Sequence, residues 1–304
     1  MAAEVERRDV HARLRWNRAS FYDFFGPTKT SLKGWEAVLG WSHSLVRDLP
    51  RTVQLTAGVS AYTGLERVPD YQNIPTSPNV DNVLVPEVRL SGKNLRSSLG
   101  AVDAEKGRQW SLSTSANINR DRRTGTPRWA AFPFLEGTID LGTPLPVRNS
   151  SLWLRTAGGW GDGNRAEPYA NVFFGGFGNN YLDRLDVKRY RENISFPGAE
   201  INSVAGTRYA KAMLDLNLPP LRFRRVGIPA FYASWLRLSV FGGALSANPD
   251  RAEWRRNLLD IGAQADLRIQ LLTQQPLTLS GGFARAFERD LAPTDEWMVS
   301  LKIL

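Results

Sequence analysis

The sequence contains no cysteine, only two histidines and only three methionines among its 304 residues. The absence of cysteine excludes disulfides, cysteine-ligated zinc, iron–sulfur centres and thiol catalysis. A transmembrane helix is also missing, because the longest uncharged stretch, 269–284, carries Gln, Thr, Pro and Ser. The first ten residues carry charges where a signal peptide has its apolar core. We therefore expect either a cytosolic protein or the C-terminal part of a longer exported chain.

What the sequence does contain is alternation of apolar and polar residues with period two, which is typical of strands with one apolar face. In 258–271, for example, Leu259, Ile261 and Leu267 alternate with Asp260 and Asp266. The pattern predicts twelve strands, at about 6–16, 31–46, 51–62, 83–99, 108–119, 128–141, 149–160, 201–216, 229–243, 257–272, 276–287 and 295–303.

The lengths of the connections between these strands indicate their arrangement. The connections 17–30, 63–82, 120–127, 161–200, 244–256 and 288–294 are on the whole longer than 47–50, 100–107, 142–148, 217–228 and 273–275. Long and short connections nearly alternate, as in up-and-down barrels with extended loops on one rim and tight turns on the other. Strands that cross a bilayer need about 9–11 residues, which fits the predicted lengths. We therefore predict one domain, 1–304, that forms a twelve-stranded antiparallel transmembrane β-barrel with both termini in the periplasm.

Periodicity alone does not show which face of the strands points outward, since membrane barrels invert the arrangement of soluble ones. Aromatic residues near predicted strand ends, such as Trp16, Trp110 and Trp160, suit the headgroup zone and favour lipid outside. The polar faces would then line a lumen, where their charges either pair and fill the interior or favour anions in a pore. The charges in question are Arg13, Arg15, Glu36, Glu136, Asp140, Arg155, Asp215, Arg237, Asp260, Asp266 and Arg268.

The segment around the longest connection carries a family pattern. Residues 172–183 read Val-Phe-Phe-Gly-Gly-Phe-Gly-Asn-Asn-Tyr-Leu-Asp; Ser195-Phe-Pro-Gly198 follows, and 214–220 read Leu-Asp-Leu-Asn-Leu-Pro-Pro. Over about 170–304 the chain resembles the C-terminal half of the bacterial surface-antigen superfamily, the barrels of outer-membrane assembly factors and two-partner secretion transporters. Such barrels usually have sixteen strands, so a sixteen-stranded relative is the alternative architecture.

The resemblance implies a Gram-negative outer-membrane barrel that acts as a translocation pore or membrane anchor for protein or solute export or assembly. It also implies that the 161–200 connection folds into or over the lumen. The expected partners are the lipid bilayer and lipopolysaccharide, the barrel assembly machinery during biogenesis, and an exported polypeptide or periplasmic domain. The loop residues expected to matter are Gly175, Gly176, Phe177, Gly178, Asn179, Asn180, Tyr181, Asp183 and Arg184.

Other functions are weighed against this one. A passive, porin-like diffusion channel is the first alternative, and a barrel hydrolase acting on lipid is the second. For a hydrolase, His43 and Ser44 are adjacent and therefore point to opposite faces of a strand, so they do not form a nucleophile–base pair. The net charge of +9 comes mostly from dispersed Arg, so we expect no nucleic-acid partner. We also expect no enzymatic activity, no metal and no cofactor.

Overall fold

The computed structural model describes residues 2–7, 9–16, 35–64, 80–121, 128–163, 167–177, 182–183, 189–228, 230–272 and 275–303. Most of these residues lie in β-strands, which confirms the predicted all-β class. Helical structure among them is limited to the short 3-10 turns η2 (Pro168–Ala170) and η3 (Arg189–Arg191). In this part of the chain no helix is long and apolar enough to cross a membrane.

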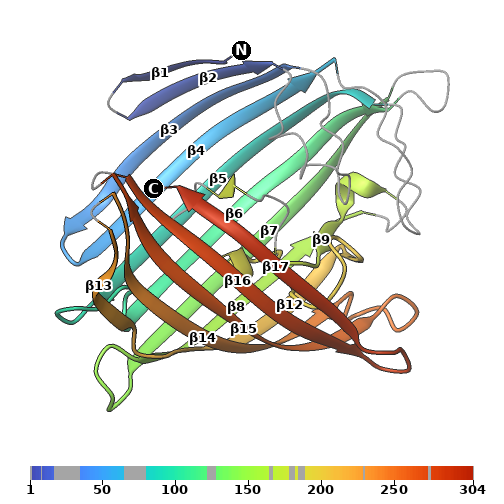
Figure 1. The fold of residues 1–304 in the computed structure, drawn as a ribbon. Coiled ribbons are helices and arrows are strands. Elements are labelled where there is room, and N and C mark those ends of the chain that lie inside the picture. The colour runs from blue at the N-terminus through green and yellow to red at the C-terminus, as the bar shows by residue number, and fades with distance from the viewer. Residues whose placement is uncertain are drawn as a thin grey trace.

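One large antiparallel sheet follows the order of the chain (Figure 1). β13 (Leu221–Ile228) pairs only with β14, and β10 (Leu182–Asp183) pairs in parallel with β17. The main strands are β1 (Ala2–Arg7), β2 (Val10–Trp16), β3 (Trp35–Asp48), β4 (Arg51–Thr63), β5 (Val80–Arg96), β6 (Lys106–Asp121), β7 (Arg128–Pro144), β8 (Ser151–Gly161), β12 (Arg208–Asn217), β14 (Phe231–Ala247), β15 (Arg256–Leu271), β16 (Gln275–Glu288) and β17 (Thr294–Ile303).

Most predicted strands correspond to an observed one, but three regions differ. The predicted strand 6–16 is a hairpin in which β1 and β2 pair from Ala2↔Arg15 to Arg7↔Val10. A connection of only two residues between the strands does not interrupt the alternation, so the pattern cannot reveal the hairpin. The predicted strand 201–216 starts only at Arg208, because Val204–Gly206 forms β11 and pairs with β9 (Val172–Phe174) in a separate small sheet. The predicted connection 217–228 contains strand β13.

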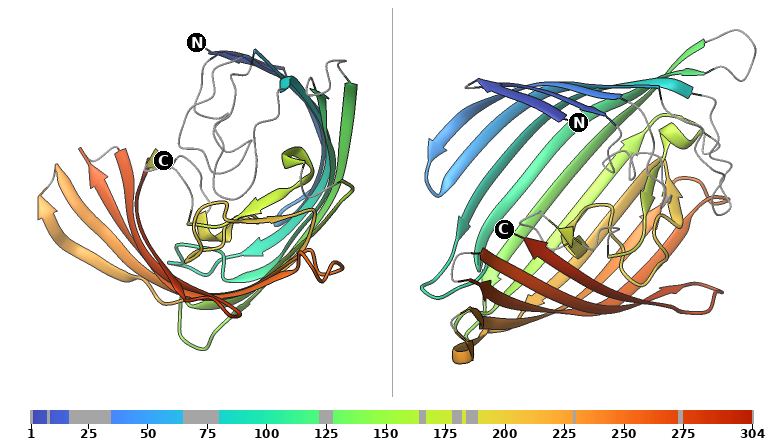
Figure 2. Two further views of the ribbon diagram at one scale, coloured as in Figure 1. Left: turned by 90° about the vertical axis from the view of Figure 1, so that its right-hand side faces the viewer. Right: turned by 45° about the horizontal axis from the view of Figure 1, so that its top comes forward.

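The sheet is strongly curved, and within the described residues its two edges are not joined. No pairing between β1 and β17 is found there, so the predicted closed barrel is an open trough in this structure (Figure 2). Part of the outer edge of β17 is instead taken by β10, through Leu182↔Leu301 and Asp183↔Lys302. A closed barrel requires the two outer edges of the sheet to pair with each other, and the pairing with β10 occupies part of the β17 edge.

The three longest connections, 17–34, 64–79 and 162–207, all begin at strand ends of one rim, as predicted, since they follow β2, β4 and β8. We name this rim the long-loop rim. The strand ends at the opposite rim, which we name the short-turn rim, are joined by the connections 8–9, 49–50, 97–105, 145–150 and 272–274 and by 218–230, which contains β13.

The convex face of the sheet is apolar and exposed, whereas the concave face is polar and covered. Along β15, Leu259 and Ile261 are 59% and 56% exposed, but Asp260 and Asp266 are only 7% and 3% exposed. The same inversion recurs on other strands, where Leu39, Val88, Leu112, Ile139, Leu214 and Val299 are exposed and Glu36, Ser113, Asp215, Ser239 and Ser280 are buried. This is the opposite of a soluble sheet, which buries its apolar face.

The hydrophobic core lies between the concave face and the segment that covers it. Fully buried Phe174 and Phe196 pack with Tyr209, Leu245 and Leu258 of the sheet. Aromatic side chains of this kind are the main apolar contribution on a face that is otherwise polar.

We expect Phe174→Ala to lower the free energy of unfolding in detergent micelles by about 3–5 kcal/mol, because it empties a fully buried site. Ile261→Ala on the exposed convex face serves as the control and should change it much less. Urea titration followed by tryptophan fluorescence measures both. Equal losses for the two variants would contradict the assignment of core and outer face.

Candidate functional site

The candidate site is formed by the segment that lies in the concave face of the sheet (Figure 2). We name residues 167–177 and 189–206 the inner segment; it comprises η2, β9, η3 and β11 and connects β8 to β12. Residues 173–177 and 195–199 are almost all buried, although they belong to a connection rather than to the main sheet.

The double glycine of the inner segment adopts a backbone conformation that few other residues can take. Gly175 and Gly176 have φ of 140° and 75°, which side chains other than glycine rarely adopt. A Cβ at Gly175 would clash with the carbonyl oxygen of Glu200. The Gly176 N–H donates to the carbonyls of Phe196 (3.1 Å) and Ala199 (3.0 Å), and Phe196 N–H donates to Gly176 O (3.2 Å). The Gly-Gly motif therefore joins the two parts of the inner segment, 167–177 and 189–206.

A second aromatic cluster fixes the inner segment to the sheet. Phe177 and Tyr190 are fully buried and pack against Phe241 of β14, with ring centroids 5.8 and 4.3 Å away, respectively. Met213 of β12 completes the contact. Burial raises the pKa of the Tyr190 hydroxyl, which keeps it protonated as a hydrogen-bond donor.

The last strand holds the inner segment through one carboxylate. Glu296 of β17 accepts hydrogen bonds from the backbone N–H groups of Phe177 (2.9 Å) and Gly198 (3.0 Å). The Thr294 hydroxyl donates to the Gly198 carbonyl at 2.6 Å. Because hydrogen bonds to a charged group are stronger than neutral ones, Glu296 is a principal anchor of the segment.

Two further charged side chains bind the inner segment from the opposite side. Lys211 of β12 donates to the carbonyls of Glu192 (2.9 Å), Asn193 (3.2 Å) and Ser195. Glu136 of β7 accepts from the Asn193 amide at 2.9 Å. The anchors therefore come from strands on both sides of the segment.

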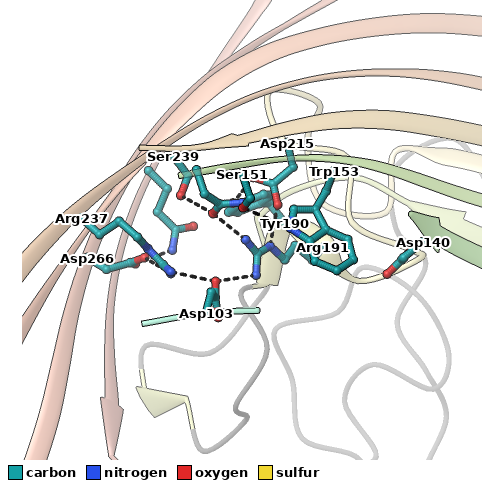
Figure 3. A network of polar contacts seen from close by, with 12 residues as sticks. Asp103, Asp140, Ser151, Trp153, Tyr190, Arg191, Asp215, Arg237, Ser239 and Asp266 are labelled. Carbon is teal, nitrogen blue, oxygen red and sulfur yellow. Dashed lines mark hydrogen bonds and ion pairs between the residues drawn. The ribbon is translucent and has the colours of Figure 1, made fainter. Parts of the chain in front are cut away.

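A network of ion pairs centred on Asp215 joins η3 to the sheet (Figure 3). Asp215 is completely buried and accepts from Arg191 Nε (2.8 Å), Arg155 Nη2 (3.2 Å) and the Tyr190 hydroxyl (2.9 Å). Arg155 also pairs with Asp140 at 2.8 Å. One carboxylate thus joins β8, β12 and the inner segment.

The network continues through Asp103, which lies in the short-turn connection 97–105. Asp103 pairs with Arg191 Nη1 at 2.9 Å and with Arg237 Nη1 at 2.8 Å. Arg237 also lies 3.5 Å from Asp266, which in turn accepts from Ser280 at 2.7 Å. Burial lowers the pKa of the Arg191 guanidinium, but the negative charges of Asp215 and Asp103 outweigh it and raise that pKa well above its usual range.

The predicted lumen charges all lie on the concave side, but they form separate groups. Asp140, Arg155, Asp215, Arg237 and Asp266 belong to the network of Figure 3. Arg13 and Arg15 lie 3.6 and 3.7 Å from Glu36, near the β1 edge. Three others lie apart, since Glu136 contacts the inner segment, Asp260 is buried on β15, and Arg268 donates to Thr278 at 3.0 Å.

Only some of the predicted loop residues belong to the part of the chain that the structure describes. Gly175, Gly176 and Phe177 are buried in the inner segment, and Asp183 takes part in the backbone pairing of β10. The remainder lie outside the described residues, namely Gly178, Asn179, Asn180, Tyr181 and Arg184.

Sequence reasoning missed Asp103, Arg191, Lys211 and Glu296. Asp103 and Arg191 lie in connections, where alternation gives no signal. Glu296 does fall in the alternating strand β17, at a polar position, but its partners are backbone groups that carry no sequence signature. Only the contacts in the folded structure identify such an anchor.

The arrangement provides ion pairs and hydrogen bonds between the inner segment and the sheet. No cluster of three His, Asp or Glu side chains suitable for a metal ion occurs among the residues described. His43 is exposed and stacks on Trp41 with ring centroids 5.7 Å apart, and its Nδ1 lies 3.8 Å from Asp9. The contacts of Glu296, Lys211 and Asp215 hold the inner segment against the sheet.

We expect Asp215→Asn to destabilise the protein by about 3–5 kcal/mol, because it leaves the guanidinium groups of Arg155 and Arg191 buried with less negative charge. Asp250→Asn is the matched control, since Asp250 pairs with Arg208 at the partly exposed long-loop rim, and we expect a loss below about 1 kcal/mol. Chemical unfolding in detergent measures both. Similar losses for the two variants would show that the network does not depend on Asp215.

Comparison with the models of known protein families gives no match, and no curated protein matches the chain significantly.

Proposed function

We propose that this chain is a bacterial outer-membrane β-barrel of the surface-antigen type, serving as a translocation pore or membrane anchor. The observation that carries the proposal is the inverted sheet. Its convex face exposes large apolar side chains on strand after strand, while its concave face buries charges. In water a continuous apolar surface of this kind favours association, whereas against lipid it is the stable arrangement.

A spanning sheet cannot leave its edges open to lipid, because each unpaired backbone group there costs several kcal/mol. We infer that the barrel closes between β2 and β17, with β1 displaced from one edge and β10 from the other. The strands from β2 to β8, then β12, then β14 to β17 number twelve, so the first and last are antiparallel. Closure through β1 would give an odd number and place β1 parallel to β17, which is not the arrangement of bacterial barrels.

Because the chain has no native cysteine, engineered pairs can distinguish the two edge arrangements. Val5 and Ala12 are opposite each other in the β1–β2 hairpin, so V5C/A12C should form a disulfide when β1 is in place. In liposomes we expect a smaller fraction of the protein to carry this disulfide. The cysteine of Ala12→Cys should cross-link instead to a cysteine introduced at one of the positions 297–302 of β17. Mass shift on a denaturing gel reports both. Persistence of the V5C/A12C bond, with no bond to β17 at any position, would contradict closure through β2.

The inner segment supports a pore that is closed at rest, or an anchor, over a passive channel. It occupies the concave face, and its anchors, Glu296, Lys211 and Asp215, come from β17 and β12. A diffusion channel requires a water-filled interior, which a buried segment with paired charges does not leave. The Gly175-Gly176 turn within this segment is the motif on which the family resemblance rests. Lipopolysaccharide, the barrel assembly machinery and an exported polypeptide or periplasmic domain are the partners that follow from the proposal.

Planar-bilayer conductance tests the proposal. We expect the wild-type protein to conduct rarely, and both Glu296→Ala and deletion of 170–195 to raise open probability several-fold, because each loosens or removes the inner segment. Glu87→Ala is the control, since Glu87 pairs with Arg89 on β5 and not with the inner segment. A large, steady wild-type conductance that neither variant changes would favour the passive channel. A protein that stays monodisperse without detergent would contradict membrane insertion.

A further inference from the structure

A basic pocket lies at the short-turn rim, outside the site described above. It has a volume of about 440 Å³ and is lined by Asn94, Arg96, Lys106, Gly107, Arg108, Leu141 and Gly142. These residues come from the end of β5, the start of β6 and the end of β7, and we name the site the basic pocket.

The strand register places the three cations of the basic pocket side by side. Arg96 is opposite Lys106, and Asn94 is opposite Arg108, which in turn is opposite Leu141. Residues directly opposite each other point to the same face of a sheet, so the cations share the face of Leu141, which is the convex one. All three are exposed.

No carboxylate neutralises these charges within the part of the chain that the structure describes. None lines the pocket, and none lies within 4.0 Å of the cationic groups of Arg96, Lys106 or Arg108 there. Glu105, the nearest acid along the chain, is buried and accepts from the Ser98 N–H at 2.7 Å instead. Three like charges in such proximity repel one another unless an external anion joins them.

The opposite rim shows that this lack of pairing is not general. At the long-loop rim Arg208, Arg251, Arg256, Arg285 and Arg289 each have a carboxylate within 4 Å. The sheet therefore neutralises several arginines within the chain at one rim and leaves a cluster of cations unneutralised at the other.

The residues next to the basic pocket follow the order of a membrane interface. One row further from the rim, the Trp110 ring lies over Gly92, so closely that a Cβ on Gly92 would meet it. Ile139 is opposite Trp110 in the same row, and Leu112 lies one row beyond. Both, together with Leu141 in the row of Arg108, are about half exposed on the convex face. Cations at the rim, a tryptophan one row in and aliphatic side chains beside and beyond it suit headgroups, interface and acyl chains.

We propose that the basic pocket binds the phosphate of an anionic phospholipid, with the acyl chains lying on Leu112, Ile139 and Leu141. The inference rests on the proposed membrane function and adds a lipid class and a rim to it. The guanidinium groups of Arg96 and Arg108 suit bidentate hydrogen bonds to phosphate oxygens, and Lys106 adds a third positive charge.

Tryptophan quenching by brominated lipids tests this, since Trp110 lies beside the pocket. The full-length protein is reconstituted in phosphatidylcholine vesicles containing phosphatidylglycerol, with the bromine on one lipid or the other, and the two quenching curves give the relative affinity. We expect the wild-type protein to prefer phosphatidylglycerol and R96Q/K106Q/R108Q to lose that preference. The relative affinity for phosphatidylglycerol should fall about fivefold, or by about 1 kcal/mol, for each cation removed. R208Q/R251Q/R289Q removes the same charge at the long-loop rim and should keep the preference.

Each remaining outcome identifies what fails. If the pocket variant inserts and keeps the wild-type preference, the basic pocket is not the lipid site, although the membrane proposal stands. If inorganic phosphate abolishes the preference at concentrations where equal ionic strength of chloride does not, the ligand is free phosphate and the lipid assignment fails. If the wild-type protein inserts into neither vesicle, the membrane proposal itself is overturned, and the lipid assignment with it.

Discussion

The structure depends on the burial of charge on the concave face of a sheet, above all that of Asp215. A carboxylate without access to water needs cations and donors within hydrogen-bond reach, and one strand cannot supply them all. Arg155 comes from the neighbouring strand β8, but Arg191 and Tyr190 come from the inner segment. The position of the inner segment follows from this requirement, because moving it away would leave Asp215 with Arg155 alone among these partners.

The same requirement explains why the two faces of the sheet differ. The charged side chains are paired with one another on the concave face. Because successive residues of a strand point to opposite faces, the apolar residues between them lie on the convex face. The glycine turn at Gly175 and Gly176 lets the inner segment approach closely enough for Phe174 and Phe177 to be buried. The polar network and the aromatic clusters thus fix the inner segment to the sheet, and Glu296 adds a hydrogen bond from the segment to the last strand, β17.

The distribution of charge along the sheet connects this interior to the surroundings that we propose. Inside, guanidinium groups meet carboxylates; at the long-loop rim they do so again, as in Arg256 and Glu288 at 2.5 Å. The basic pocket at the short-turn rim departs from this pattern, which is why we look outside the chain for its anion. A closed, lipid-facing barrel with a held inner segment accounts for all three regions with one orientation in the membrane.

The sequence by itself determined most of the strands, their two faces and the common rim of the three longest connections, because alternation and loop length are local properties of the chain. It also singled out Gly175 and Gly176, and the charges of the polar faces, Asp215 among them. It could not show that residues 2–16 form a hairpin or that 221–228 form a strand, since a turn of two residues leaves alternation intact and a connection can extend as a strand. Only the tertiary structure decided which charges meet, as Asp103 and Arg191 do from two connections far apart in the chain, because the partner of a buried charge is set by the curvature of the sheet and not by its neighbours in sequence.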